Sequence, residues 1–296
     1  MLFKVLGPLE VELAADDVVV PGGARARALL AALLLRPGAV VPVHRLAEVV
    51  WGDAQPESVE NAVHVTVARL RRALGAAGAC VVTRAPGYLL DLRGARVDAD
   101  LFEEWCRAAR TRMDVDPAEA ARLLDDALAL WRGPAFGDLA DGFARPAAVR
   151  LEELRRGAAE DRAEALLRTG AVEQAVAAAG DLAAAHPLAE RPVAVLVRGL
   201  AATGRTADAL DAYRRLACVM REELGLDPSP ELRELHGRLL REELVVPAPA
   251  GVRLPRRPSP LVGRDEELGA IAAALGEGPL VTLTGPGGVG KSLFVN

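Results

Sequence analysis

The fold is decided by one stretch, residues 58–75, which reads SVENAVHVTVARLRRALG. At about 100° per residue on a helix, its large apolar residues fall on one narrow stripe, which predicts a core-facing side. That stripe consists of Val63, Val67, Leu70 and Leu74. The opposite face collects Ser58, Asn61, Val65, Ala68, Arg69 and Arg72. This face is small near the helix start and basic near its end, a shape that the DNA major groove accepts.

The residues on either side of this helix supply the rest of a small domain. Alternating apolar residues predict strands over 3–13, broken at Gly7-Pro8, and over 18–20. Helices are predicted over residues 24–35 and 43–51, each stopped by glycine or proline. After the third helix, over 57–74, residues 80–83 and 88–92 predict a hairpin. A small sheet, three helices and a terminal hairpin follow the order of a winged helix-turn-helix, which we assign to residues 1–97.

The exposed face of the third helix is the candidate DNA reader. Asparagine pairs with adenine, arginine with guanine or phosphate, and valine contacts the thymine methyl group. We expect Arg71, at the side of the helix, to reach the DNA backbone. Thr83 and Arg84, at the hairpin tip, would reach a neighbouring phosphate or the minor groove. The predicted DNA contacts are Ser58, Asn61, Val65, Arg69, Arg71, Arg72, Thr83 and Arg84. The alternative is that the arginines form an ordinary solvated helix face, and the winged-helix order is what favours DNA.

The charge of the chain restricts where nucleic acid can bind. The 296 residues carry a formal net charge of -5, which excludes a uniformly basic coat. Residues 1–97 hold eleven basic and nine acidic side chains, whereas the rest of the chain is acidic overall. The three cysteines are scattered without a CxxC pair, so neither a disulfide framework nor a zinc site is indicated. No signal peptide and no apolar run of membrane-spanning length is seen, so we expect a soluble cytoplasmic protein without membrane partners.

Three segments resemble a known family. They are residues 50–53 (VWGD), 63–75 (VHVTVARLRRALG) and 82–90 (VTRAPGYLL). Together they resemble the output domain of response regulators, and more closely the antibiotic regulatory proteins of actinobacteria, the SARP family. The resemblance implies that Trp51 and Tyr88 are packing residues and not DNA contacts. Residues 61–65 match no family pattern for base choice, so the operator sequence stays open.

Residues 98–246 are predicted to be nearly all helical. The segments GAVEQA (170–175) and GRTADA (204–209) are offset by 34 residues, the period of tetratricopeptide repeats. We place a third, degenerate unit in residues 117–131. Residues 97–102 and 222–232 resemble the bacterial transcriptional activation domain of SARP regulators, and the resemblance extends over residues 1–243. Such repeats either form a surface for partners or self-association, which we favour, or only support the fold.

The C-terminal residues predict a linker and the start of a nucleotide-binding domain. Residues 247–260 contain five prolines, which predicts an extended linker. From residue 261, an entry segment resembling that of STAND-type ATPases precedes a strand at 279–284, and residues 285–292 (GPGGVGKS) then match GxxxxGK[ST]. The predicted phosphate-binding residues are Gly285, Gly287, Gly288, Val289, Gly290, Lys291 and Ser292. Ser292 would also hold Mg²⁺.

The sequence stops four residues after Ser292, so this P-loop α/β segment is truncated. We therefore expect the chain to be a fragment of a longer regulator, and not itself an enzyme. In a full-length form ATP or ADP with Mg²⁺ would be the cofactor, and DNA binding would need none. No receiver segment precedes the winged helix, so phosphorylation of an aspartate in cis is not expected.

The sequence as a whole predicts a mostly α protein with a small N-terminal α/β winged helix-turn-helix, TPR-like repeats and a truncated P-loop segment. The resemblance implies a sequence-specific transcriptional activator of a secondary-metabolite gene cluster, such as one for an antibiotic. It would bind direct repeats in promoter DNA as a homo-oligomer and recruit RNA polymerase with its sigma factor. The alternative is a STAND-type signalling ATPase whose N-terminal domains are protein-interaction modules.

Overall fold

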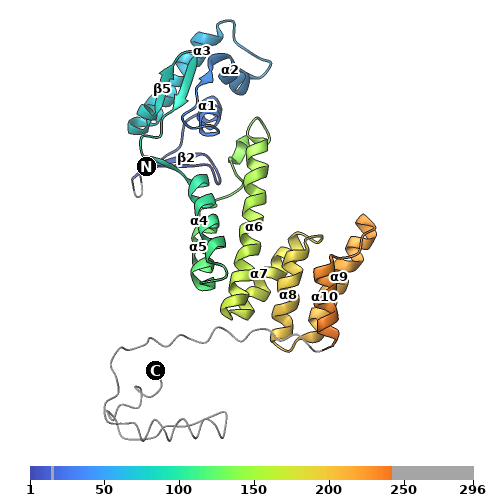
Figure 1. Cartoon of the computed structure of the whole chain (residues 1–296). Helices are drawn as coiled ribbons and strands as arrows, with labels where there is room; N and C mark the ends of the chain where they lie inside the picture. Colours follow the sequence, from blue (N-terminus) through green and yellow to red (C-terminus); the bar gives the residue numbers. More distant parts are fainter. Residues whose placement is uncertain (15–16, 242–296) are drawn as a thin grey trace, which may run out of the picture. The chain divides into compact units, whose positions relative to one another are not determined.

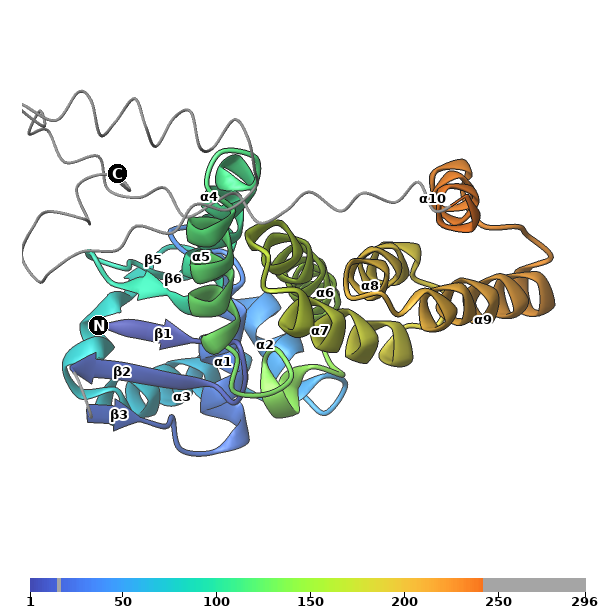
Figure 2. The ribbon, with the colours of Figure 1, turned by 90° about the horizontal axis from the view of Figure 1, so that it is seen from below.

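The computed structural model describes residues 1–14 and 17–241. The described residues lie in one compact unit, Met1–Val246. The predicted linker, the strand at 279–284 and the P-loop residues lie outside the described residues, so these three features stay predictions. Figures 1 and 2 show the described elements.

The N-terminal sheet has the strand order β3-β2-β1-β7. Strands β1 (Leu2–Lys4), β2 (Glu10–Ala14) and β3 (Asp17–Val19) are antiparallel neighbours, as the alternating pattern predicts. Strand β7 (Arg96–Val97) adds to β1 in parallel. The sequence did not predict β7, because two residues are too few to show a period of two.

Three helices and a second sheet complete the winged helix-turn-helix. They are α1 (Ala24–Leu34), α2 (Val43–Trp51) and α3 (Val59–Ala73). The second sheet has the order β4-β6-β5, from β4 (Val41–Pro42), β6 (Gly87–Leu90) and β5 (Val81–Arg84). A 3₁₀ helix, η1 (Gly75–Cys80), joins α3 to the hairpin. The three helices and the hairpin are confirmed, whereas the sequence pattern did not predict the short β4.

The rest of the described chain is an array of helices, in which each helix from α4 to α9 packs against the next (Figure 1). The helices are α4 (Asp98–Arg112), α5 (Pro117–Ala129), α6 (Arg145–Thr169), α7 (Val172–Ala185), α8 (Glu190–Ala202), α9 (Thr206–Leu224) and α10 (Pro230–Leu240), with the 3₁₀ turn η2 (Gly137–Leu139) before α6.

The 34-residue offset corresponds to equivalent turns in this array. Gly170 and Gly204 both have positive φ, 83° and 74°, a conformation that glycine adopts without strain. A side chain at Gly199 would come within 2.6 Å of Val176, so α7 and α8 approach closely at this glycine. The sequence prediction of helical repeats with small residues at crossings is confirmed.

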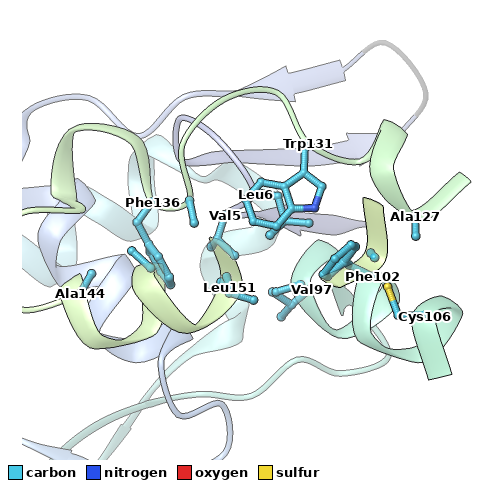
Figure 3. Close-up of a cluster of buried hydrophobic side chains, with 14 of the residues drawn as sticks. Val5, Leu6, Val97, Phe102, Cys106, Ala127, Trp131, Phe136, Ala144 and Leu151 are labelled. Atoms are coloured by element: carbon cyan, nitrogen blue, oxygen red, sulfur yellow. The ribbon is translucent and has the colours of Figure 1, made fainter. Parts of the chain in front are cut away.

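One hydrophobic core runs through both halves of the described chain, the N-terminal half up to Val97 and the helical half from Asp98. Figure 3 shows Val5 and Leu6 of the N-terminal half beside Phe102, Trp131 and Phe136 of the helical half. The rings of Phe102 and Trp131 meet edge to face, with centroids 5.4 Å apart. β7 ends at Val97 and α4 begins at Asp98, so no linker separates the halves. Among the described helices none is long and apolar enough to cross a membrane.

Candidate nucleic-acid interface

Helix α3 is amphipathic in the way that its sequence predicts. Val63, Leu70 and Leu74 are fully buried, and Val67 is 1% exposed. On the opposite side, all six residues of the predicted reading face are exposed: Ser58, Asn61, Val65, Ala68, Arg69 and Arg72. Val65 is among the exposed large apolar side chains, with 42% of its surface accessible. The structure therefore confirms which side of α3 faces outward.

The β5–β6 hairpin forms the wing beside α3. Arg84 pairs with Gly87 across a two-residue turn, and Thr83 and Arg84 are exposed as predicted. Gly87 allows β4 to pair with the wing, because a Cβ there would lie 2.0 Å from the carbonyl oxygen of Val41. β4 thus holds the wing next to its turn, at Gly87 and Tyr88, while Thr83 and Arg84 on the other strand remain exposed.

Arg71 joins α3 to the wing. Its Nε and Nη2 donate to the carbonyl oxygen of Val81 at 2.9 and 2.7 Å, and Nη2 also donates to Thr83 Oγ1 at 2.9 Å. The guanidinium lies 5.8 Å from the ring centroid of Tyr88. Burial raises the pKa of Tyr88 and the charge of Arg71 opposes that rise. The contact of Arg71 with the DNA backbone stays a prediction, and in this structure its donors are directed at the protein.

The remaining arginines of this surface, Arg69, Arg72 and Arg84, form no ion pair with any described residue. Of the other arginines in residues 1–97, Arg27, Arg45, Arg93 and Arg96 form one, and Arg25, Arg36 and Arg71 do not. These three guanidinium groups of Arg69, Arg72 and Arg84, on one helix face and the adjacent wing, can donate to phosphate oxygens or to the guanine edge without first breaking an ion pair with a described residue.

His64 is a residue of this surface that the sequence pattern did not single out. It is exposed on α3, and its ring meets that of Tyr88 edge to face with centroids 6.1 Å apart. His64 follows Asn61 by three positions and precedes Ala68 by four, a spacing that places it on the same side of a helix. This helical spacing could have predicted that His64 lies on the exposed face of α3. Taken alone, a histidine far from other ligand residues is only a weak candidate for metal binding. The described residues contain no group of side chains suited to hold a metal ion.

Two family models match successive parts of the chain. The model described as transcriptional regulatory protein, C terminal, matches residues 18–90. The model of the bacterial transcriptional activator domain matches residues 97–240. The boundary between the two matches coincides with β7.

Curated regulators are similar over most of the chain. The transcriptional regulator RedD of Streptomyces coelicolor is 34% identical over 259 residues, covering 84% of this chain and 73% of RedD. The regulatory protein AfsR of Streptomyces griseus is 34% identical over 307 residues, covering 98% of this chain but only 31% of AfsR. The chain therefore spans less than a third of AfsR and most of RedD.

A solved structure is similar in fold. That structure is of Mycobacterium tuberculosis EmbR in complex with a low-affinity phosphopeptide. It matches with a TM-score of 0.75 and 31% identity over 82% of this chain and 65% of that one. Together with the two family models and the match to RedD, this shows that the chain belongs to the SARP family of transcriptional regulators.

Proposed function

We propose that this regulator binds promoter DNA with α3 in the major groove and the wing on the neighbouring backbone. The observation that carries the proposal is the set of unpaired arginines, Arg69, Arg72 and Arg84, on one surface made by α3 and the wing. A cation held without an acidic partner inside the protein is available to replace the counterions of phosphate groups.

The side chains of α3 divide by chemistry and position. Asn61, Val65 and Arg69 suit base edges, because they match adenine, the thymine methyl and guanine in turn. Ser58, at the helix start, and Arg72, at its end, suit the sugar-phosphate backbone, as do Thr83 and Arg84 on the wing. Arg71 acts on this surface by holding the wing against α3, since its donors already bind Val81 and Thr83.

The proposal also covers the DNA target, the partners and the regulated genes. We propose direct repeats in a promoter as the target, occupied by two or more copies, with RNA polymerase and its sigma factor as partners and a secondary-metabolite cluster as the regulated genes. The family supports activation of transcription, and the helical array offers a surface beyond what DNA binding requires. ATP or ADP with Mg²⁺ at residues 285–292 is a proposal carried by the motif alone. The match to AfsR, which extends over 98% of this chain, is consistent with it.

Fluorescence anisotropy with a fragment of the promoter from the gene's own neighbourhood tests DNA binding. The variant combines Arg69→Ala with Arg72→Ala, and the control combines Arg214→Ala with Arg215→Ala, two exposed arginines of α9. We expect the α3 variant to bind at least about 30-fold more weakly, since it loses two contacts that each contribute on the order of 1–3 kcal/mol. The magnitude of its slope of log K against log salt should fall by about 1, because Arg72 is the one of the two assigned to a phosphate.

The control should bind like the unsubstituted protein, because it removes the same charge from another surface. Binding no tighter than to random DNA, with the α3 variant unchanged, would refute the assigned surface. That result would favour the alternative, in which the N-terminal domains are protein-interaction modules of a signalling ATPase.

A further inference from the structure

Two consecutive residues after β1 have all four backbone polar groups bonded to the helical half. The N–H groups of Val5 and Leu6 donate to the two carboxylate oxygens of Asp98, at 2.7 and 3.1 Å. The carbonyl oxygen of Leu6 accepts from the N–H of Arg132 at 2.8 Å, and that of Val5 from the N–H of Phe136 at 2.7 Å. The backbone of Val5 and Leu6 is therefore held from both sides, by α4 and by the segment between α5 and η2.

The carboxylate of Asp98 lies at the centre of this contact. Asp98 is 1% exposed, and Arg132 Nη2 lies 3.6 Å from its Oδ2. Burial raises the pKa of Asp98, while the hydrogen bonds from Val5 and Leu6 and the charge of Arg132 lower it. Arg132 extends the contact, because its Nη1 donates to Glu10 at 2.6 Å and to the carbonyl oxygen of Pro8 at 3.1 Å.

Residues 136–138 pack closely against the N-terminal half. Phe136 has φ 62° although it is not glycine, and it is 3% exposed in the shared core (Figure 3). The next residue, Gly137, has φ 53°, and a Cβ there would lie 3.0 Å from Cα of Pro8. Asp138 then pairs with Arg27 of α1 at 2.7 Å. An uncommon backbone conformation of a buried aromatic residue is maintained only where its surroundings fix it.

We infer that Asp98 is a positioning residue that locks the winged helix-turn-helix and the helical array into one rigid body. Separating the halves would break the hydrogen bonds of these four backbone groups and expose the apolar cluster around Trp131 and Phe136 to water, and both changes are unfavourable. β7 and α4 follow one another without a linker, so the chain itself gives no hinge at this junction. In such a rigid body the helical array keeps a fixed orientation relative to α3. This goes beyond the proposed function, since it concerns the free protein and does not depend on DNA.

Pulsed EPR distances between the halves test the inference. Cys218 on α9 is exposed and Cys80 and Cys106 are buried, so a label at Cys218 and a second at Ala73→Cys, exposed at the end of α3, report on both halves. We expect a single narrow distance distribution in the free protein. Asp98→Ala should broaden it at least twofold while circular dichroism shows unchanged helix content.

Two further variants make the result decisive. Asp100→Ala removes an exposed carboxylate from the same first turn of α4 and should leave the distribution narrow. Arg132→Met keeps the backbone bond to Leu6 but removes the guanidinium contacts, and it should broaden the distribution as well. It carries the test if Asp98→Ala does not fold. A broad distribution in the unsubstituted protein would overturn the inference, and so would a narrow one in both Asp98→Ala and Arg132→Met. No DNA is present, so failure of this experiment leaves the proposed function untouched.

Discussion

Neighbouring arginines on α3 differ in their contacts, and therefore in what they can bind. Arg71 is half-buried and its donors bind Val81 and Thr83, whereas Arg72, one position later, is exposed without an ion-pair partner among the described residues. A helix turns by about 100° per residue, so adjacent side chains point to different surroundings. The same residue type thereby fixes the wing at one position and remains available for DNA at the next.

Replacing Arg71 with methionine should loosen the wing. The change removes hydrogen bonds from a charged donor to Val81 and Thr83, so we expect a stability loss of about 1–2 kcal/mol. Hydrogen exchange of the amides of residues 81–87 should also become faster. Arg72→Met is the matched control, and its stability in urea should stay within about 0.5 kcal/mol of the unsubstituted protein. Equal losses for both variants would contradict the role given to Arg71.

Gly87→Ala should disrupt the pairing of β4 with the wing. The added Cβ would lie 2.0 Å from the carbonyl oxygen of Val41, which is backbone and cannot rotate away. We expect urea unfolding to show a loss of about 2 kcal/mol or more, in the range of overpacked cores. Gly22→Ala is the control, because a Cβ there meets nothing within 4 Å. A Gly87→Ala variant as stable as the control would show that the strands can shift to admit the methyl group.

At the scale of elements, α3 has one buried and one exposed face, and the proposed function assigns DNA recognition to the exposed one. Val67 lies in the core with 1% exposure, whereas Val65 is 42% exposed on the reading face. The two valines are the same in chemistry and only two positions apart. Their difference in burial follows from the helical period.

Alanine at these two valines should therefore give opposite results. Val67→Ala is expected to lower the unfolding free energy by about 2 kcal/mol, through lost burial and the cavity left behind. Its DNA affinity should be unaffected at temperatures where it is folded. Val65→Ala should leave thermal unfolding nearly unchanged and weaken binding to the promoter. Denaturation and anisotropy on both variants check this, and the reverse pattern would mean that α3 is rotated from its assigned orientation.

The helices α6 and α8 are joined by a half-buried carboxylate, Glu164, whose protonation should change the stability of the fold. Glu164 of α6 accepts from Arg198 of α8 and from Arg168 at 2.8 Å. Burial by itself raises the pKa of Glu164, but the hydrogen bonds and charges of Arg198 and Arg168 outweigh it and hold the pKa below its ordinary value of 4.5. The folded state therefore binds this proton less tightly than the unfolded chain does.

The stability that Glu164 contributes should thus be complete above about pH 4.5 and be lost as the pH falls through its lowered pKa. Urea midpoints measured from pH 7 to pH 3 should decline less steeply in Glu164→Gln than in the unsubstituted protein. Glu173→Gln, at an exposed position of α7, serves as the control and should keep the original slope. Identical slopes in all three proteins would exclude a stabilising role of the ionised Glu164.

At the scale of the whole described chain, one core joins the two family domains. Interdomain faces that move freely are usually small and polar. In this protein Trp131, Phe136 and Leu6 belong to one apolar cluster (Figure 3). Asp98 accepts the backbone N–H groups of Val5 and Leu6. Such a contact should make the two halves unfold together.

Native-state hydrogen exchange in increasing urea tests this cooperativity. The slowest amides of α3 and of α4 should share one free energy of opening, because both depend on the same core. Asp98→Ala should separate the two values by lowering the protection of one half first. Clearly different values in the unsubstituted protein would show that the halves open independently in spite of their contact.

Residue patterns over short stretches of sequence were enough to predict several features of this protein. The period of Val63, Val67, Leu70 and Leu74 determined the buried side of α3, and with it the exposed face. The Gly170 and Gly204 turns at a 34-residue offset determined the helical repeats. The family signatures were readable because they lie in contiguous segments such as residues 82–90. These features depend on residues close together in sequence, whose spacing the helix or hairpin converts directly into geometry.

Other features were decided only in three dimensions. The partner of Arg71, the pairing of β4 with β6 and of β7 with β1, and the bonding of Asp98 to Val5 and Leu6 depend on residues between 10 and 94 positions apart. No period or motif encodes which of several arginines will find an acceptor, or which carboxylate will be buried. That choice follows from the packing of the whole core, which excludes water and leaves each polar group only the partners that the fold brings to it.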